Sequence, residues 1–396
     1  MQLAGRLKGL ESGIFNEMES QKRRVEARGI KVINLGVGTP DRPPAPHVLE
    51  AMHRAVDRLD NYRYPLEGRP ELYRAAAGWY RRRFGVDLDP ESEILVLMGS
   101  QDGLAHIALA YVDQGDIALV PDPGYPIYSF SITMAGGELY PVPLLEENGF
   151  LPVLSSIPAE VARRAKMMWI NYPNNPVAAV ANREFFKEVV DFAKQYNILV
   201  CHDVAYSELC YDGFKPMSFL EVDGAREVGI EFFSLSKTYN MAGCRIGFAV
   251  GNKDVIGTLR RVKSNIDYGV FYVVQDAGIA ALEGPQDSVE ENARAYQRRR
   301  DLLVDGLAAA AGWHMPKPKA SMFVWAPLPP GYTSSTRFSL ELLDRAGVLV
   351  IPGIAFGARG EGYVRIALVQ EEEVLQEAVR RIGSVYNFNA AGRSPS

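Results

Sequence analysis

Short apolar segments alternate with helical patterns between about residues 90 and 250, and this alternation limits the possible folds more than any other feature of the chain. Each segment is continuously hydrophobic, which is typical of strands that are buried on both faces of a parallel sheet. The segments lie at residues 94–98, 117–120, 166–170, 198–201, 231–234 and 246–250, with a helix predicted at 183–195. We therefore expect an α/β fold with a mostly parallel sheet of about seven strands between helices, and ligands beyond the carboxyl ends of the strands.

The last third of the chain has a different pattern, in which Pro- and Gly-rich loops separate the predicted elements. These elements are a long helix at 292–311 and strands at 321–325, 348–351 and 363–367. A second, smaller α+β domain follows from this pattern. The predicted domains are residues 1–45 (an N-terminal segment with a helix around 16–28, packing on the small domain), 46–285 (the large domain) and 286–396 (the small domain).

Composition narrows the expected partners and location. The net charge of −5 argues against nucleic acid, which favours basic faces. No apolar run approaches the ~20 residues of a membrane span, and the first ten residues do not resemble a signal peptide. Cys201, Cys210 and Cys244 form no C-x-x-C pair, so neither a disulfide framework nor a metal site is expected. We expect a cytoplasmic protein without membrane or nucleic-acid partners.

Lys237 follows an apolar run, with Ser234 three residues before it and Arg245 eight residues after it. A lysine that forms a Schiff base must hold its amine at one point, close to anion-binding groups if its cofactor carries a phosphate. Ser234 and Arg245 can supply those groups. An isolated serine–lysine pair of this spacing is usually a solvated surface feature, so the interpretation depends on residues elsewhere in the chain.

The first two predicted strands are followed by a polar turn and by an aromatic loop. The turn at 99–104 contains Ser100 and Gln101 and opens a helix, whose free backbone N–H groups can bind phosphate. A simple helix cap explains such a turn more often when it is taken alone. The loop at 121–128 is stiffened by prolines and presents Tyr125, which can stack on an aromatic cofactor or pack in the core.

The next two predicted strands end in polar side chains. Asn175 lies in the proline-rich turn at 171–176 and can donate to a phenolate oxygen, although the turn alone would be unremarkable. Asp203 follows a buried run directly, so its carboxylate needs a partner, either a protonated ring nitrogen or an arginine. Tyr206 can reach the same ring, whereas His202 is more simply a core residue.

The order of these features along one sheet is more specific than any one of them. With this order the chain resembles the aspartate-aminotransferase-like (fold type I) family of pyridoxal-phosphate enzymes over nearly its full length. Within that family it is most similar to the alanine and LL-diaminopimelate aminotransferase-like branch. The residues at 200–206, 239–248 and 267–271 carry this closer likeness.

The resemblance implies pyridoxal 5'-phosphate as the cofactor, with Lys237, Asp203 and Tyr125 as the catalytic residues. Lys237 would bond to the cofactor and transfer protons, Asp203 would pair with the pyridine nitrogen, and Tyr125 would stack on the ring. The other implied cofactor contacts are Tyr206 and Asn175 at the ring hydroxyl, and Ser100, Gln101, Ser234 and Arg245 at the phosphate.

The resemblance also implies how substrate and subunits meet. Arg365 would clamp the substrate α-carboxylate in a bidentate fork, and the loop at 35–41, with Gly38, would close over the substrate beside Asn175. Tyr64 would reach the phosphate of a neighbouring subunit, which implies a homodimer with shared active sites. In one turn the chain departs from the family pattern, because Val177-Ala178 stands where Thr-Gly is usual. At another position Cys244 replaces a common tryptophan.

We therefore expect an aminotransferase that moves an amino group between an α-amino acid and a 2-oxo acid in a ping-pong cycle, of the alanine/glutamate or LL-diaminopimelate type. The same fold and cofactor support C–S β-elimination, which the core motifs do not distinguish. A non-catalytic aminotransferase-like regulator is the other alternative, but only ~30 residues precede the segment at 32–35, too few for a helix-turn-helix module with its linker.

The side-chain pocket of the substrate is the least defined part of this prediction. Candidate pocket residues are Phe15, Val37, Tyr268 and Phe271, of which Tyr268 can come from either chain of a dimer. Arg63, Lys263 and Arg359 can be considered as clamps for a side-chain carboxylate, but each is more simply an ordinary surface charge.

Overall fold

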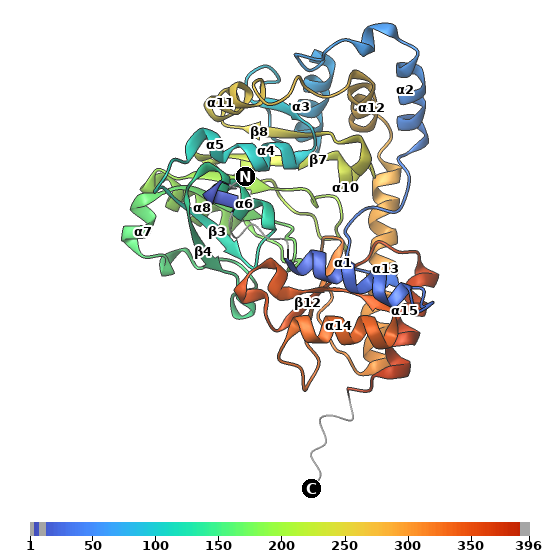
Figure 1. Ribbon diagram of the computed structural model, residues 1–396. Helices are drawn as coiled ribbons and strands as arrows, with labels where there is room; N and C mark the ends of the chain where they lie inside the picture. Colours follow the sequence, from blue (N-terminus) through green and yellow to red (C-terminus); the bar gives the residue numbers. More distant parts are fainter. Residues whose placement is uncertain (1–3, 8–12, 389–396) are drawn as a thin grey trace.

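A seven-stranded sheet, here called the large sheet, forms the centre of the protein. The computed structural model describes residues 4–7 and 13–388, and the sheet has the strand order β2-β8-β7-β6-β5-β3-β4. Figure 1 labels β3, β4, β7 and β8 of this sheet among the helices that surround it. Its strands are β2 (Ile94–Leu97), β3 (Ile117–Asp122), β4 (Glu138–Pro143), β5 (Ala165–Asn171), β6 (Leu199–Asp203), β7 (Gly229–Ser234) and β8 (Gly247–Gly251). Only β8 runs antiparallel to its neighbours, so the mostly parallel sheet is confirmed.

The strand β4 was absent from the sequence prediction. It lies at the edge of the sheet, paired only with β3, and Val142 is its one buried residue. It also contains Pro141 and Pro143, which have no N–H to donate to a second neighbour. A search for continuously apolar segments cannot detect a half-exposed edge strand of this composition.

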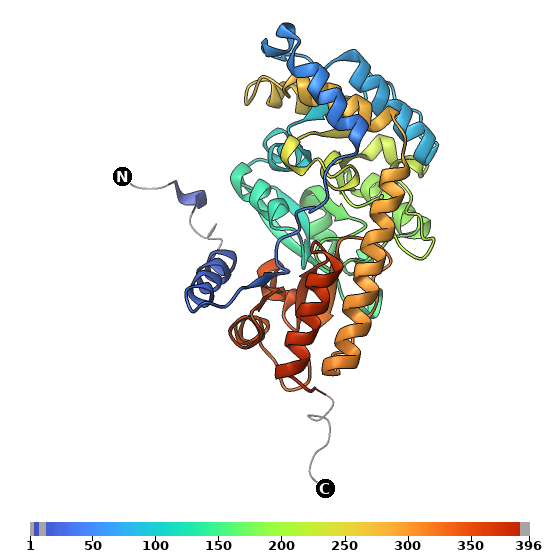
Figure 2. The same ribbon diagram turned by 90° about the vertical axis from the view of Figure 1, so that its right-hand side faces the viewer.

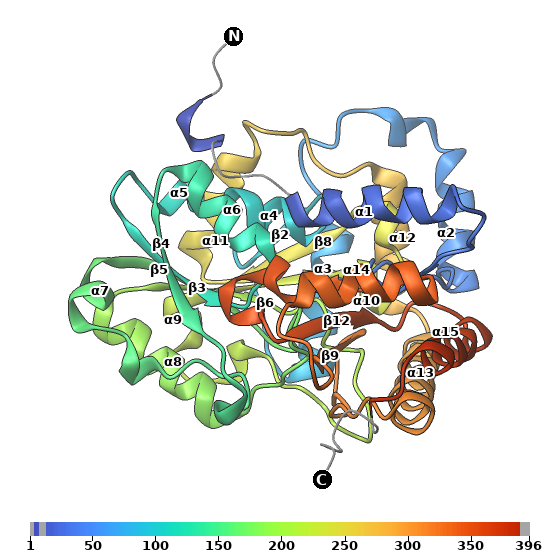
Figure 3. The ribbon, with the colours of Figure 1, turned by 60° about the horizontal axis from the view of Figure 1, so that its bottom comes forward.

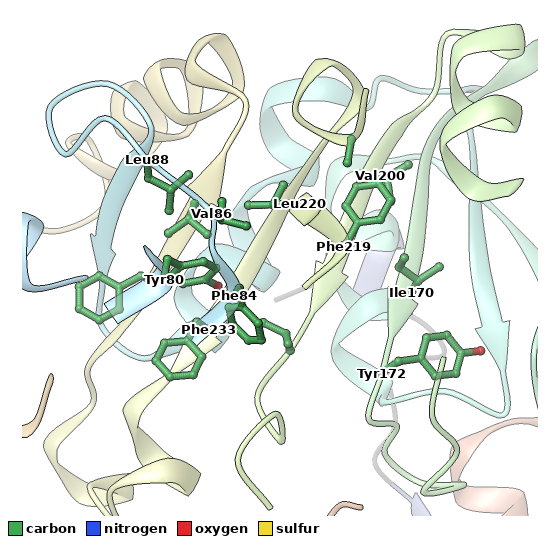
Figure 4. Packing of buried hydrophobic residues seen from close by; sticks show 14 of the residues in the cluster. Tyr80, Phe84, Val86, Leu88, Ile170, Tyr172, Val200, Phe219, Leu220 and Phe233 are labelled. Carbon is green, nitrogen blue, oxygen red and sulfur yellow. The ribbon is translucent and has the colours of Figure 1, made fainter. Parts of the chain in front are cut away.

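Helices cover both faces of the large sheet. Alternate strand residues point to opposite faces, so one face packs against α3, α8 and α12 and the other against α4, α6 and α11. On the first face Trp79 stacks on Phe233 with ring centroids 4.4 Å apart, and Figure 4 shows Tyr80 and Phe84 beside the same Phe233 side chain. The helices of this part of the chain are α2 (Pro46–Val56), α3 (Pro70–Phe84), α4 (Ser100–His106), α5 (Ala108–Tyr111), α6 (Pro126–Ala135), α7 (Ala159–Arg164), α8 (Arg183–Tyr196), α9 (Ala225–Val228), α10 (Leu235–Thr238), α11 (Lys253–Lys263) and α12 (Tyr272–Glu283).

A second, antiparallel sheet, here called the small sheet, has the order β11-β12-β9. Its strands are β9 (Phe323–Pro327), β11 (Ile351–Pro352) and β12 (Tyr363–Ala367), and next to it β1 (Ile33–Asn34) pairs in parallel with β10 (Val348–Leu349). The helices around it are α1 (Gly13–Glu26), α13 (Asp287–Ala311), α14 (Ser335–Ala346) and α15 (Glu372–Val385). Figure 3 shows α1 along α14 and α13 along α15. The predicted strand at 348–351 is interrupted at Val350 and forms two short strands instead.

The helix α13 joins the two parts of the molecule. It begins at Asp287, five residues before the predicted start, and runs from the helices of the large sheet to those of the small sheet (Figure 2). The domain boundaries near residues 45 and 286 stay a prediction. Within the described part of the chain, no helix is both long and apolar enough to cross a membrane, and no group of three His, Cys, Asp or Glu side chains is placed to hold a metal ion.

Candidate active site

A cavity of about 490 Å³ lies between the carboxyl ends of the large-sheet strands and the small sheet. The large sheet contributes residues that end or follow β2, β3, β5, β6 and β7, and the small sheet contributes Phe323 and Arg365. The predicted site residues that line it are Gly38, Ser100, Gln101, Tyr125, Asn175, Asp203, Tyr206, Ser234, Lys237, Arg245 and Arg365. A larger surface groove of about 960 Å³ beside α8 contains none of them.

Lys237 lies in the single-turn helix α10, which Ser234 caps by accepting a hydrogen bond from the Ser236 N–H at 3.2 Å. The lysine Nζ donates to the carbonyl oxygen of Gly38. Burial, together with the positive charges of Arg365 and Arg245, lowers the pKa of Lys237 to about 8, although Asp203 opposes the shift. A substantial share of the amine is therefore neutral near physiological pH, which is the form that attacks a carbonyl carbon.

Asp203, the last residue of β6, has one carboxylate oxygen that is unused by the described residues. Tyr128 donates to Oδ2 at 2.8 Å, whereas Oδ1 is buried and has no partner in residues 4–7 and 13–388. Burial raises the pKa of Asp203 to about 6, and the Tyr128 hydrogen bond and the neighbouring His202 and Lys237 oppose this rise. A buried carboxylate with a free oxygen is suited to a cationic N–H group, such as a protonated pyridine nitrogen.

The anion-binding end of the cavity depends on two glycines. A Cβ atom on Gly99, which has a φ of 75°, would lie 2.6 Å from Nη2 of Arg245, so only glycine lets the guanidinium approach this backbone. A Cβ atom on Gly247 would lie 2.8 Å from the backbone nitrogen of Ser100. Arg245, Ser100 and Ser234 all line this part of the cavity. The cation and the polar groups form a cradle that fits a phosphate.

Two tyrosines line the middle of the cavity. Tyr125 donates to Oε1 of Gln101 at 2.9 Å, which fixes its ring orientation. Tyr206 is buried and packs edge-on against Phe323, with ring centroids 5.8 Å apart. Burial and the charge of Asp203 raise the pKa of Tyr206, so the hydroxyl stays protonated and can donate. An aromatic ring therefore finds a flat neighbour and a hydroxyl donor here.

Arg365 on β12 is a buried cation whose hydrogen bonds go to neutral oxygens. Nη1 donates to Oδ1 of Asn175 at 2.8 Å and Nη2 to the Gly36 carbonyl at 2.7 Å, while Nε has no partner among the described residues. The guanidinium also lies over the rings of Phe323 and Phe356, 4.2 and 4.6 Å from their centroids. Burial lowers its pKa to about 10, so it stays charged at neutral pH. An incoming carboxylate is the missing counter-ion.

Several predicted residues lie outside the cavity. Tyr64 is 74% exposed, and its ring meets that of Tyr268 edge-on at 5.2 Å. Phe15 packs against Phe356, and among the four pocket candidates only Val37 lines the cavity.

The interpretation of Lys263 as a surface charge is wrong. Its side chain is 8% exposed and donates to Asp102 and Asp267, each at 2.7 Å. Because both aspartates already neutralise this lysine, it is not a free carboxylate clamp either. Arg63 forms an exposed ion pair with Asp60, as expected of a surface charge.

The turn at Asn174–Ala179 keeps a left-handed residue despite its unusual sequence. Ala178 has a φ of 57°, a region that favours glycine. The turn is closed by the Asn174 N–H donating to the Ala179 carbonyl at 2.9 Å and by the Val177 N–H donating to Oδ1 of Asn174 at 3.0 Å. Replacing the usual Thr-Gly therefore leaves Asn175 in the cavity.

Sequence reasoning missed Tyr128 and Phe323. Tyr128 lies three residues after Tyr125, within the first turn of α6, and the hydrogen bond to Asp203 forms only because β3 and β6 belong to one sheet. Phe323 supports Tyr206 and Arg365 from the small sheet. No local pattern marks either residue, because both contacts join segments far apart in the sequence.

The fold and the cavity together are those of a pyridoxal-phosphate enzyme. The same cavity contains a lysine of lowered pKa, a buried carboxylate that can pair with a ring nitrogen, and a cradle that fits a phosphate. The family described as aminotransferase class I and II matches residues 30–382, and the chain belongs to this family. It is therefore a pyridoxal-phosphate-dependent aminotransferase, a class of enzyme whose substrates are amino acids and 2-oxo acids.

Relatives and solved structures agree with this assignment. The chain is 52% identical over 386 residues to an LL-diaminopimelate aminotransferase of Moorella thermoacetica, covering 97% of this chain and 98% of that one. It is 53% identical over 380 residues to one of Syntrophobacter fumaroxidans, covering 96% and 97%. The substrate-bound structure of BacF from Bacillus subtilis matches with a TM-score of 0.93 at 40% identity, covering 97% of this chain and 98% of that one. These full-length likenesses favour neither the β-lyase nor the regulator alternative.

Proposed function

We propose that this aminotransferase takes its amino group from LL-diaminopimelate and passes it to a 2-oxo acid. The observation that carries the proposal is the set of relatives named LL-diaminopimelate aminotransferase, which are 47–53% identical over 96–97% of the chain. The buried Arg365 supports a substrate with an α-carboxylate. Because LL-diaminopimelate carries two amino-acid ends, one end meets Arg365 and the other extends away from Lys237.

Each lining residue has a role that its chemistry supports. The cofactor, when bound, supplies a protonated ring that withdraws electrons from the substrate Cα. Lys237 Nζ would accept the proton from that carbon and would donate the same proton to the cofactor carbon that bears the amino group, so that the amine is neutral again at the end. Asp203 Oδ1 would accept a hydrogen bond from the ring N–H, and Tyr206 and Asn175 would donate to the ring hydroxyl. Arg365 holds the α-carboxylate, so that the Cα–H bond faces the lysine.

The proton transfer suits a lysine of lowered basicity. A general base acts best when its pKa lies near the working pH, and burial beside Arg365 and Arg245 lowers the pKa of Lys237 to about 8. The same positive charges attract the anionic groups of substrate and cofactor. The cavity therefore combines binding charges with a base that is easily deprotonated.

A homodimer in the cytoplasm completes the proposal. Large apolar side chains are exposed together on the segment 59–66 and on the facing segment 266–271. They include Leu59, Tyr62, Leu66 and the Tyr64–Tyr268 pair, and Tyr62 also contacts Phe271. An exposed patch of this kind fits an interface with a second copy. Tyr64 would then complete the partner's phosphate cradle.

Mixing two impaired variants tests the shared site. Lys237→Ala and Tyr64→Ala homodimers are both expected to be impaired, the former more severely. In a heterodimer one site carries both native residues and the other carries both substitutions, so activity should rise above the mean of the parents toward half of wild type per heterodimer. Activity is measured after subunit exchange has been verified by mass. No gain on mixing would mean that Tyr64 acts within its own chain or only in packing.

The substrate is tested with a panel of amino donors. LL-diaminopimelate, L-alanine, L-glutamate and L-aspartate are compared with 2-oxoglutarate and with pyruvate as acceptors, and kcat/KM is expected to be highest for LL-diaminopimelate. A sulfur amino acid is included, since release of pyruvate and ammonia without amino transfer would indicate a lyase. A higher kcat/KM for one of the three other donors would contradict the proposed substrate while leaving the aminotransferase class intact.

A further inference from the structure

The backbone of segment 35–41, here called the strap, accepts hydrogen bonds from two of the three cationic side chains that line the cavity. Nη2 of Arg365 donates to the Gly36 carbonyl at 2.7 Å, and Nζ of Lys237 donates to the Gly38 carbonyl. Val37, Gly38 and Thr39 also line the cavity. Any shift of the strap therefore changes the hydrogen bonds of the two side chains that are proposed to hold the substrate and to move its proton.

The first half of the strap is fixed by the small sheet. The Leu35 N–H donates to the Leu349 carbonyl at 2.8 Å, and the Leu35 carbonyl accepts from the Ala367 N–H at 2.7 Å. A Cβ atom on Gly38 would lie 2.4 Å from the ring of Phe323, so this backbone lies directly on the aromatic side chain. These contacts leave the far end of the strap, beyond Thr39, to be fixed by other means.

Arg299 of α13 holds that far end. Its Nη1 donates to Oδ1 of Asp41 at 2.8 Å and its Nη2 to Oδ2 at 2.7 Å, which is a bidentate fork. The same guanidinium donates to the Leu368 carbonyl at 3.3 Å and pairs with Glu371 at 3.2 Å. Leu368 directly follows β12, the strand that carries Arg365. Arg299 thus ties the end of the strap to the strand of the carboxylate-binding arginine.

We propose that Arg299 is a positioning residue for the amino-acid site. Its side chain is only 2% exposed and is not among the cavity-lining residues, so it acts through Asp41 and the strap. Burying a guanidinium removes its hydration, which costs free energy, so the charge needs an anionic partner inside the protein. The planar fork fixes the direction of the Asp41 carboxylate, which the single point charge of a lysine does not. This inference rests on the proposed roles of Arg365 and Lys237.

The next residue along the helix is a matched control. The Arg300 side chain is also 2% exposed, and it also forms a bidentate pair, with Nη1 and Nη2 at 2.6 and 3.1 Å from the carboxylate oxygens of Asp212. It donates as well to the Pro318 carbonyl at 2.9 Å and lies 5.0 Å from the ring centroid of Tyr211. Among the described residues, Arg300 forms no hydrogen bond, ion pair or ring contact with the strap. Substituting Arg300 therefore perturbs α13 and removes a buried guanidinium, as substituting Arg299 does, but it leaves the strap in place.

The test compares Arg299→Lys with Arg300→Lys in two measurements. Hydrogen exchange of the cofactor-free protein should be faster in the peptide 35–42 for Arg299→Lys only, whereas both variants lower the Tm. In the holoenzyme, with whichever donor is most active, Arg299→Lys should raise KM and lower kcat/KM by about 10- to 100-fold, as expected when a reacting group is displaced. Arg300→Lys should keep KM within about twofold of wild type, because Arg300 holds Asp212 and the Pro318 carbonyl and does not contact the strap.

Asp41→Asn and its combination with Arg299→Lys test whether Arg299 acts through Asp41. Asp41→Asn, at a side chain that is 22% exposed, removes the same fork from its other end. It should reproduce the faster exchange and the higher KM, and the double variant should be no worse than the more impaired single variant. Equal exchange and equal KM in Arg299→Lys and Arg300→Lys, or a loss confined to Tm, would overturn the proposal. Because the exchange is measured without cofactor or substrate, it does not depend on LL-diaminopimelate being the donor.

Discussion

Lys237→Ala is expected to abolish transamination, with kcat lowered by more than about 10⁴-fold, because both the covalent attachment point and the proton-transferring amine are lost. The fold should survive the change. Lys237 has a pKa below its usual range, so folding disfavours its charged form at pH values below about 8. Removing the amine removes that penalty, and the cofactor-free variant should be at least as stable as the native cofactor-free protein at pH 7.

The measurement combines single-turnover kinetics with thermal unfolding of the cofactor-free proteins. Lys187→Ala, at an exposed lysine on α8, serves as the control and should keep native rates. A native turnover rate in Lys237→Ala would refute the assignment of the catalytic lysine. A variant that is inactive but clearly less stable than the native protein would show instead that Lys237 has a structural role.

Asp203→Ala is expected to lower kcat by about 10²- to 10⁴-fold, a range typical of the loss of a proton-controlling group. Without the carboxylate, nothing among the described residues at this position keeps the ring nitrogen protonated. Asp203→Glu should retain more activity because it restores a carboxylate. Tyr128→Phe is the matched control, since it removes the 2.8 Å hydrogen bond to Oδ2 and leaves the carboxylate itself intact. Rates near wild type in single-turnover deprotonation by Asp203→Ala would show that the role is wrong.

The pH dependence of the free energy of unfolding of the cofactor-free protein tests whether the Asp203 carboxylate is buried. Burial raises the pKa of Asp203 to about 6, above its ordinary value. The folded state therefore binds this proton more tightly than the unfolded state, and the associated stability is present at low pH and lost as the pH rises through about 6. Asp203→Asn should thus increase the free energy of unfolding at pH 8, with the difference disappearing below about pH 4. An unchanged difference across this range would mean that the carboxylate is not buried in the cofactor-free protein.

The sequence was sufficient to predict the residues at the carboxyl ends of the parallel strands. Ser100, Tyr125, Asn175, Asp203 and Ser234 each end a short apolar segment or follow it within a few residues, so their position in the chain determines which edge of the sheet they occupy. The strand β4 was not predictable because it is a half-exposed edge strand. Its absence from the prediction did not affect the site, since β4 contributes no lining residue.

Contacts between the two sheets could not be predicted from local patterns. Arg365 and Asn175 are 190 residues apart in the sequence, and their hydrogen bond exists only because β12 faces the turn after β5. Arg299 and Arg300 are adjacent and equally buried, yet one holds the strap and the other holds Asp212. Helical rotation by about 100° per residue separates their directions. Which of the two arginines faces the strap depends on how α13 is placed between the two sheets, and the local sequence does not specify that placement.

The central claim, that Lys237 carries the cofactor in this cavity, is tested most directly by borohydride reduction of the native holoenzyme, followed by peptide mass mapping. The account predicts that reduction fixes the cofactor covalently to the peptide containing Lys237, with one cofactor per chain, and that the visible absorbance of the enzyme disappears as it does so. Attachment to any other lysine, or a native enzyme that transaminates while Lys237 remains unlabelled, would contradict the account.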